Sequence, residues 1–134
     1  MSRTYLAVAG TSIDCAEPRE LAEFYLALLG GELLWDSSDS VGLRTESGLC
    51  LVAQKVANYV PPIWPSTSIV HLDLDAGADL AGSVAYAIEC GATEATEQPD
   101  PRWRVLLDPA GHPFCITTEV YTDWSLTRPQ TGDV

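Results

Sequence analysis

Basic residues are scarce in this chain of 134 residues. Lys and Arg number 7 against 19 Asp and Glu, so the formal net charge is −12. A surface with this charge repels the phosphate backbone of nucleic acids and the headgroups of anionic lipids. We therefore expect neither nucleic acid nor a membrane as a partner. The same charge favours cationic ligands, although it is also ordinary for a soluble acidic protein.

Long hydrophobic runs and paired cysteines are missing as well. No apolar stretch reaches the roughly 20 residues that span a bilayer, and no secretion signal is evident, so we expect a cytoplasmic protein. The four cysteines form no Cys-x-x-Cys pair, which indicates free thiols rather than a disulfide framework. At 46% hydrophobic residues, the chain can form a core without such cross-links.

What the sequence does contain is one pattern that occurs twice. Ile13–Cys15 is followed by a helical stripe, a glycine and Leu49–Leu51, and Leu72–Leu74 is followed by the same features and Phe114–Ile116. The separation between corresponding positions grows slowly along the chain, as loop insertions between two copies of one unit would produce. A unit too short to bury its own core must pair with its copy, so we expect a pocket at the seam.

Each copy predicts the element order βαβββ. Apolar residues at helical spacing indicate helices over Pro18–Leu29 and Leu80–Glu89, the second with Asp79 as its N-cap. The predicted strands are Tyr5–Cys15, Glu32–Trp35, Val41–Arg44 and Leu49–Ala53, then Ile69–Leu74, Thr93–Glu97, Arg102–Leu107 and Pro113–Val120, with a turn at Asp108–Gly111 before the last. These elements predict one domain over residues 1–125, with modules at 4–55 and 68–120, a proline-rich crossover at 56–67 and a flexible tail at 126–134.

Alternation along the predicted strands separates polar from apolar faces. His71 and Asp73 share one face of their strand, and Ser12 and Asp14 share one face of theirs. A histidine beside a carboxylate can act as a general acid or base, so we predict a catalytic cluster of His71, Asp73 and Asp14 at the seam. The alternative is a pair of residues that only holds the strand ends together.

Five further residues are predicted to contact a ligand: Ser12, Trp64, Trp103, Thr117 and Glu119. Trp64 lies on the proline-bracketed crossover, and loops commonly carry binding residues. Trp103 offers aromatic surface that suits a pocket, although its apolar neighbours on the same strand face also fit core packing. Ser12, Thr117 and Glu119 belong to the polar strand faces.

In their order and spacing these elements resemble the glyoxalase-like branch of the vicinal oxygen chelate superfamily. The resemblance covers about residues 4–120 and rests on the repeat, on Phe24-Tyr25 in the first helix, on the strand His71–Leu74 and on Asp108–Cys115. It implies an α+β fold in which two βαβββ modules form an incompletely closed eight-stranded cup, the glyoxalase/bleomycin resistance/dioxygenase fold. Such cups are often built across a dimer, so we expect a homodimer.

Metal-dependent members of that superfamily place histidine and carboxylate ligands on the first and last strands of each module. Here His71 matches one such position, residues 10–12 offer no histidine at the equivalent place, and Cys50 and Cys115 stand where relatives carry glutamate. We therefore expect no metal and no other cofactor. The alternative is zinc or another divalent ion bound by His71, Cys50 and Cys115 with an open fourth position.

Two classes of function follow from the resemblance. The preferred one is a metal-independent protein, like the bleomycin-binding members, that binds or transforms a small oxygenated or cationic molecule in the cup. The alternative is a metal-dependent lyase, isomerase or dioxygenase-type enzyme that uses the atypical Cys and His site. Whether the protein is an enzyme stays open at this point, as does a third possibility, a cup that works only as a dimer.

Overall fold

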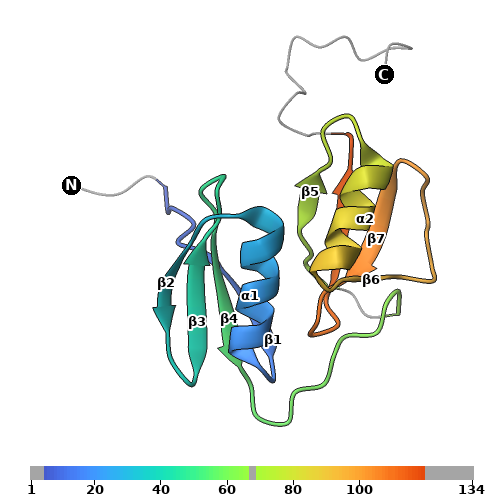
Figure 1. The fold of residues 1–134 in the computed structure, drawn as a ribbon. Coiled ribbons are helices and arrows are strands. Elements are labelled where there is room, and N and C mark those ends of the chain that lie inside the picture. The colour runs from blue at the N-terminus through green and yellow to red at the C-terminus, as the bar shows by residue number, and fades with distance from the viewer. Residues whose placement is uncertain (1–4, 67–68, 120–134) are drawn as a thin grey trace.

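The computed structural model describes residues 5–66 and 69–119, and the predicted element order occurs in it twice. The first module contains β1 (Thr11–Cys15), α1 (Pro18–Leu29), β2 (Glu32–Asp36), β3 (Ser40–Arg44) and β4 (Cys50–Lys55). The second contains β5 (Asp73–Asp75), α2 (Leu80–Cys90), β6 (Thr93–Glu94), β7 (Trp103–Leu107) and β8 (Pro113–Thr117). Figure 1 shows the two modules side by side. The expected α+β fold of two βαβββ modules is confirmed.

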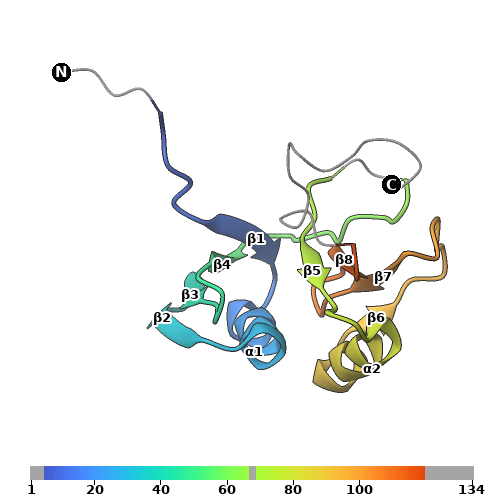
Figure 2. The ribbon, with the colours of Figure 1, turned by 90° about the horizontal axis from the view of Figure 1, so that it is seen from above.

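Each module forms a four-stranded mixed sheet with the same topology, in the orders β1-β4-β3-β2 and β5-β8-β7-β6. In both sheets the first strand pairs in parallel with the last, and the remaining neighbours are antiparallel. Seen from above, both helices lie on one side of the sheets, and the edge strands β1 and β5 face the seam (Figure 2). The chain between β4 and β5 crosses on the other side, away from the helices (Figure 2).

Local chemistry accounts for the helix ends. Pro18 occupies the first turn of α1, where its missing N–H has no helical partner to lose. The Asp79 carboxylate accepts a hydrogen bond from the backbone N–H of Gly82 at 2.8 Å and thereby caps α2 as predicted. Gly30 and Gly91 follow the two helices with φ angles of 71° and 125°, a region that favours glycine.

The main core lies between the sheets and the helices and includes residues of both modules. Leu21 and Phe24 of α1 and Leu51 of β4 belong to the same buried cluster as Leu106 of β7 and Phe114 of β8. The rings of Phe24 and Phe114 have centroids 6.0 Å apart. Because burial of apolar surface is the main favourable term in folding, this shared cluster joins the modules.

Some predicted strands are longer than the observed ones. β1 begins at Thr11 and not at Tyr5, and β5 covers only Asp73–Asp75. Both are edge strands, so the residues before them have no second neighbour to hold them in a ladder. β6 ends at Glu94, because beyond it the side-chain amide of Gln98 bonds β7 in place of a strand. Its oxygen accepts from the Val105 N–H at 2.9 Å, and its nitrogen donates to the Val105 carbonyl at 2.8 Å.

The predicted turn at Asp108–Gly111 is present, with the Gly111 N–H donating to the Asp108 carbonyl at 2.8 Å. The last strand ends at Thr117, before the predicted limit of Val120. Val120 and the predicted tail at 126–134 lie outside the described residues, as do residues 4 and 68 at the predicted module limits. Within the described ranges, no helix has the length and apolar character that crossing a bilayer requires.

Candidate functional site

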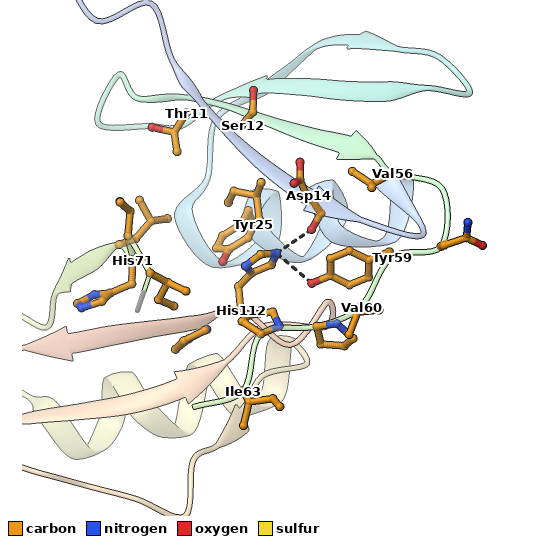
Figure 3. Close-up of a pocket in the computed structure, with 18 residues that line it drawn as sticks. Thr11, Ser12, Asp14, Tyr25, Val56, Tyr59, Val60, Ile63, His71 and His112 are labelled. Carbon is orange, nitrogen blue, oxygen red and sulfur yellow. Dashed lines mark hydrogen bonds between the residues drawn. The ribbon is translucent and has the colours of Figure 1, made fainter. Parts of the chain in front are cut away.

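A cleft of about 750 Å³ opens along the seam between the modules (Figure 3). Thr11, Ser12 and Asp14 of β1 form one wall, and the residues just before β5 and β8 form the other. The crossover between the modules completes the lining. Most of the lining is apolar, with side chains of Val56, Val60, Pro61, Pro62, Ile63, Ile69, Val70 and Leu72. We call this space the inter-module cleft.

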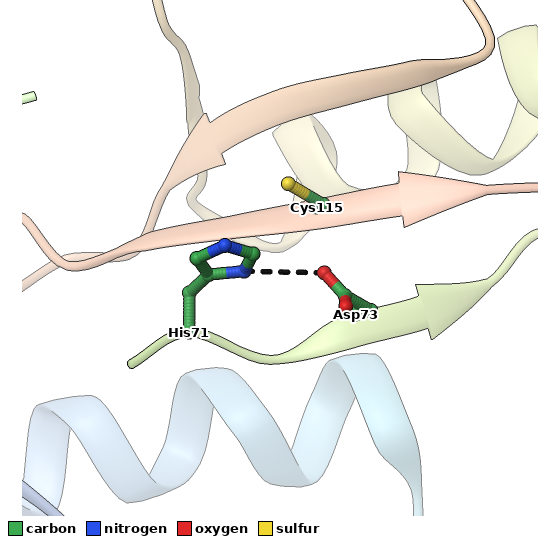
Figure 4. A group of neighbouring side chains, drawn as sticks. All are labelled: His71, Asp73 and Cys115. Atoms are coloured by element: carbon green, nitrogen blue, oxygen red, sulfur yellow. Dashed lines mark ion pairs between the residues drawn. The ribbon is translucent and has the colours of Figure 1, made fainter. Parts of the chain in front are cut away.

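The predicted pair of His71 and Asp73 is in contact. The Nδ1 atom of His71 lies 3.1 Å from Oδ1 of Asp73, as Figure 4 shows. A carboxylate accepts hydrogen bonds, so Nδ1 carries the proton of the neutral ring and Nε2 keeps its lone pair. His71 lies two residues before the start of β5 and does not belong to the strand.

Asp14 and Ser12 reach the same cleft from the first module. Both line it together with His71, although strands β1 and β5 belong to different sheets. Among the described residues, no hydrogen bond or ion pair involves the Asp14 carboxylate. The structure therefore brings the three residues of the predicted catalytic cluster to one region, with His71 and Asp73 paired and Asp14 across the cleft.

A smaller hollow of about 140 Å³ adjoins His71 and is lined by Trp64, Trp103 and Thr117, all predicted ligand contacts. The two tryptophans pack against a buried cluster that contains Val105 and Cys115, so each has a structural role. Trp64 also donates from Nε1 to the Glu97 carbonyl at 3.1 Å.

The polar residues at the end of β8 are engaged with the backbone. The Thr117 hydroxyl donates to the Arg102 carbonyl at 3.2 Å and accepts from the Glu119 N–H at 2.9 Å. Glu119 lines neither the inter-module cleft nor the smaller hollow. Ligand contact by Glu119 stays a prediction that the geometry does not favour.

Three groups that can bind a metal ion lie close together beside the smaller hollow. One ligand atom each of His71, Asp73 and Cys115 falls within 4.8 Å of the others (Figure 4). Burial, followed by the nearby Asp73, raises the pKa of the Cys115 thiol to about 11, so a bound cation would have to displace its proton. Nitrogen, carboxylate and sulfur donors suit zinc. Cys50, the other predicted ligand, is not in this group and packs beneath Gly10.

The structure adds a second histidine that the sequence analysis did not select. Nε2 of His112 lies 2.7 Å from the Asp14 carbonyl oxygen and 3.0 Å from the Tyr59 hydroxyl (Figure 3). The Tyr59 hydroxyl lies 2.6 Å from the Ala110 carbonyl, to which it donates. Burial, followed by the charge of Asp108, raises the pKa of Tyr59 to about 12, so the hydroxyl keeps its proton at neutral pH. Two signals in the sequence could have identified His112, the rarity of histidine and its place directly after the Asp108–Gly111 turn.

A buried pair behind His112 joins the two modules. The Tyr25 hydroxyl of α1 donates to Oδ2 of Asp108 at 2.6 Å, and Oδ1 of Asp108 accepts from the N–H groups of Ala110 and His112 at 2.9 Å and 3.0 Å. Burial raises the pKa of Asp108 and also that of Tyr25, while the hydrogen bonds to Asp108 act in the opposite direction on the carboxyl. The pair fixes the turn that carries His112 against the helix of the other module.

The cleft has few charged side chains among the described residues. Asp14 is its one carboxylate there, neither Lys nor Arg is among the lining residues, and His71 and His112 are its two imidazoles. Four arginines pair with carboxylates elsewhere: Arg19 with Glu23 and Asp36, Arg44 with Glu32, Arg102 with Asp100, and Arg104 with Glu94. The local charge therefore disfavours anionic ligands and suits neutral or cationic ones.

The family model described as a glyoxalase-like domain matches residues 10–117. Among solved structures, a mutant of the fosfomycin resistance protein FosX from Listeria monocytogenes, complexed with Mn(II) and 1S,2S-dihydroxypropylphosphonic acid, has a TM-score of 0.67 at 11% identity. That alignment covers 88% of this chain and 94% of the other.

Two further solved structures are similar. A glyoxalase/bleomycin resistance protein/dioxygenase family enzyme from Burkholderia phytofirmans PsJN has a TM-score of 0.62 at 20% identity, covering 82% of this chain and 97% of the other. A glyoxalase-related enzyme from Fulvimarina pelagi has a TM-score of 0.63 at 16% identity, covering 84% of this chain and 88% of the other. No curated protein sequence matches the chain. At these identities the structural likeness shows the fold alone.

Proposed function

Because the chain belongs to the glyoxalase-like domain family of the vicinal oxygen chelate superfamily, we propose that it binds a small neutral or cationic organic molecule in the inter-module cleft, without needing a metal ion. The observation that carries this proposal is the composition of the cleft. Both modules contribute to its walls, the walls are mostly apolar, and Asp14 lies among them without a Lys or Arg in the described lining.

The size of the cleft supports the proposal. Its volume of about 750 Å³ falls within the range of roughly 300–1,000 Å³ that is usual for small-molecule sites. Apolar walls of this kind bury the body of a ligand, and a few polar groups fix its orientation. In this site we assign the orienting role to His71 and Asp14.

His71 also gives the cleft a group that can move a proton. Asp73 holds the ring through Nδ1, which leaves Nε2 free to accept a proton from a bound molecule. This arrangement supports a lyase or isomerase reaction on an oxygenated molecule as the enzymatic form of the proposal. Simple sequestration of the same molecule needs only the binding step.

The inter-module cleft of this chain does not suit the ligand of the Listeria protein. That protein is complexed with a phosphonic acid and Mn(II), and a phosphonate is an anion. The described lining of the inter-module cleft offers it no Lys or Arg, and Asp14 would repel it. We therefore propose a ligand of the opposite or no charge.

Binding of matched cations and anions tests the proposal. We expect 2-phenylethylammonium to raise the melting temperature, because a ligand at a hundredfold its dissociation constant stabilises the native state by about 2.7 kcal/mol. We expect 3-phenylpropionate, a carboxylate of similar size, to have no such effect. Calorimetric titration should show that Asp14→Asn weakens ammonium binding by about tenfold, as loss of one partly desolvated charge pair would.

Asp39→Asn is the matched control, because Asp39 is an exposed carboxylate between β2 and β3 that does not line the cleft. Equal binding of the ammonium and the carboxylate would contradict the proposal. So would an equal loss of affinity in the Asp14 and Asp39 variants.

A second candidate function follows from the group of His71, Asp73 and Cys115. These residues would hold a divalent ion such as zinc, which when bound supplies a Lewis acid that polarises a ligand oxygen. Metal analysis of protein purified without a histidine tag should then give close to one equivalent. Cys115→Ala should abolish that binding, and Cys90→Ala, a change on α2 away from the group, should retain it.

The proposal includes a homodimer. Large apolar side chains are exposed before both edge strands, at Tyr5, Leu6 and Val8 (83%, 84% and 87%) and at Val70 (93%). Exposed apolar clusters often mark protein interfaces, and uncovered sheet edges are otherwise an aggregation hazard. Light scattering at micromolar concentration should give the mass of two chains, and the mass of one chain would contradict this part of the proposal.

A further inference from the structure

The partners of His112 locate the proton on its ring. Nε2 lies 2.7 Å from the Asp14 carbonyl oxygen, which can only accept, so Nε2 donates. The Tyr59 hydroxyl gives its own proton to the Ala110 carbonyl at 2.6 Å and therefore also accepts from Nε2, at 3.0 Å. The neutral ring must then carry its proton on Nε2, and Nδ1 keeps a lone pair.

The Nδ1 atom of His112 is accessible from the cleft. Among the described residues no hydrogen bond reaches Nδ1, and no fully buried side-chain nitrogen or oxygen lacks a partner, so this atom keeps contact with solvent. His112 lines the inter-module cleft, and Figure 3 shows the Nδ1 edge of its ring turned away from Tyr59. A ligand in the cleft can therefore take the place of solvent at Nδ1.

Three hydrogen bonds fix the position of His112. Its ring Nε2 contacts the Asp14 carbonyl of the first module and the Tyr59 hydroxyl of the crossover, and its backbone N–H donates to Asp108. Asp108 is itself held by the buried Tyr25 hydroxyl. A ring held in this way loses little conformational freedom when a ligand binds, which favours affinity.

The two histidines of the chain present opposite nitrogens. His71 donates from Nδ1 to Asp73 and keeps a lone pair on Nε2, whereas His112 donates from Nε2 and keeps a lone pair on Nδ1. Together with the Asp14 carboxylate, the cleft thus offers three acceptors on its lining residues. A set of acceptors selects a ligand that presents hydrogen-bond donors.

We propose that His112 is a ligand-binding residue whose Nδ1 accepts a hydrogen bond from an N–H or O–H group of the ligand. The ligand class is a small molecule with at least two donors, such as a primary ammonium, an amino alcohol or a diol. This inference rests on the proposed function, because it takes the inter-module cleft as the ligand site.

Nitrogen NMR of the full-length protein tests the inference directly, because the chain contains two histidines and the His71→Gln variant assigns both. At a pH where both rings are neutral, we expect His112 to show the Nε2–H form and His71 the Nδ1–H form. Addition of 2-phenylethylammonium should shift the Nδ1 signal of His112. The N,N,N-trimethyl analogue keeps the charge but has no donor, so it should leave that signal in place and bind at least about tenfold more weakly.

His112→Gln provides the matched variant. Its side-chain amide can still donate to the Asp14 carbonyl, so the melting temperature should stay close to wild type. Its acceptor oxygen branches from Cδ and does not take the position of Nδ1, so ammonium affinity should fall about tenfold. An Nδ1–H form of His112 overturns the inference, as does cleft binding that leaves the Nδ1 signal unmoved; in the second case the proposed function stands. If neither cation shifts any resonance of the cleft, the proposed function fails and the inference fails with it.

Discussion

The two modules share one topology and differ in what they bury. Five residues of α1 are buried, namely Pro18, Leu21, Ala22, Phe24 and Tyr25, whereas α2 buries Ala87 and leaves Tyr86 and Ile88 about half exposed. The polar and thiol side chains of the candidate site lie mainly in the second module. His71, Asp73, His112 and Cys115 all belong to the second module, and the first contributes Asp14.

This contrast teaches that a repeated unit need not repeat its role. Apolar contacts of the first module supply most of the helix packing, so the second module can carry titratable groups at the seam. Mutations in α1 should therefore affect stability more than mutations in α2, whereas most mutations that affect ligand binding should fall in the second module, with Asp14 as the exception.

One leucine from each helix gives the largest expected contrast. Leu21 of α1 is 1% exposed, whereas Leu80, the first residue of α2, is only partly buried. Leu21→Ala should lower the free energy of unfolding by about 2–5 kcal/mol, because it leaves a cavity in a closed core. Leu80→Ala should cost about 1 kcal/mol. Urea unfolding of the two variants measures the difference, and equal losses would break the comparison between the modules.

The hydrogen bond between Tyr25 and Asp108 should matter next. Tyr25→Phe removes the donor and leaves a buried carboxylate oxygen without its partner, which should cost about 1–3 kcal/mol. Tyr86→Phe is the matched control, because the exposed Tyr86 hydroxyl donates to the Ala27 carbonyl and its loss should cost about 0.5 kcal/mol or less. Similar losses in the two variants would show that the buried pair does not join the modules.

His71→Ala should separate binding from stability. The His71 side chain is 33% exposed and contributes little to the core, so the unfolding free energy should change by less than about 1 kcal/mol. Affinity for 2-phenylethylammonium should fall by about tenfold or more, as loss of one hydrogen bond to a charged group would produce. A variant that unfolds, while a ligand still binds wild type far from the cleft, would make His71 a structural residue.

The smallest expected effect is on alkaline stability. The pKa of Tyr59 is raised to about 12 in the folded protein, above its usual value near 10. The fold therefore favours the protonated Tyr59 hydroxyl. Its contribution to the free energy of unfolding is complete below about pH 10 and is lost progressively as the pH rises toward about 12. Wild type should therefore lose more stability across that interval than Tyr59→Phe. Urea midpoints measured below and within the interval test this, and parallel losses would refute it.

The sequence predicts the helices well because their signals are local. Pro18, Asp79 and the glycines that follow each helix act within one turn of the chain, and α1 has the predicted bounds. The limits of β1 and β5 depend instead on how many neighbours an edge strand has, which the alternation of residues does not reveal.

The sequence predicts only part of the candidate site, because only some of its contacts follow from local patterns. Alternation along the strands places His71 beside Asp73 and Ser12 beside Asp14. His71, Ser12 and Asp14 line the inter-module cleft, and Asp73 lines the smaller hollow. The contact of His112 with Asp14 joins residues far apart in the chain through a turn held by Tyr25, so no local pattern encodes it. Cys50 shows the limit of reasoning by symmetry, because its counterpart Cys115 lies near His71 and Cys50 does not belong to that group.

Mapping of backbone amide shifts upon addition of 2-phenylethylammonium tests the central claim most directly. If the inter-module cleft is the ligand site, the shifts should include residues 11–14 of the first module, His112 of the second, and the crossover residues that line the cleft and carry an amide N–H, namely Val56, Asn58, Tyr59, Val60 and Ile63. A competing site exists on the helix side, where Asp75, Asp79 and Tyr86 line a hollow of about 310 Å³. Shifts confined to that hollow, with none at Asp14 or His112, would contradict the account.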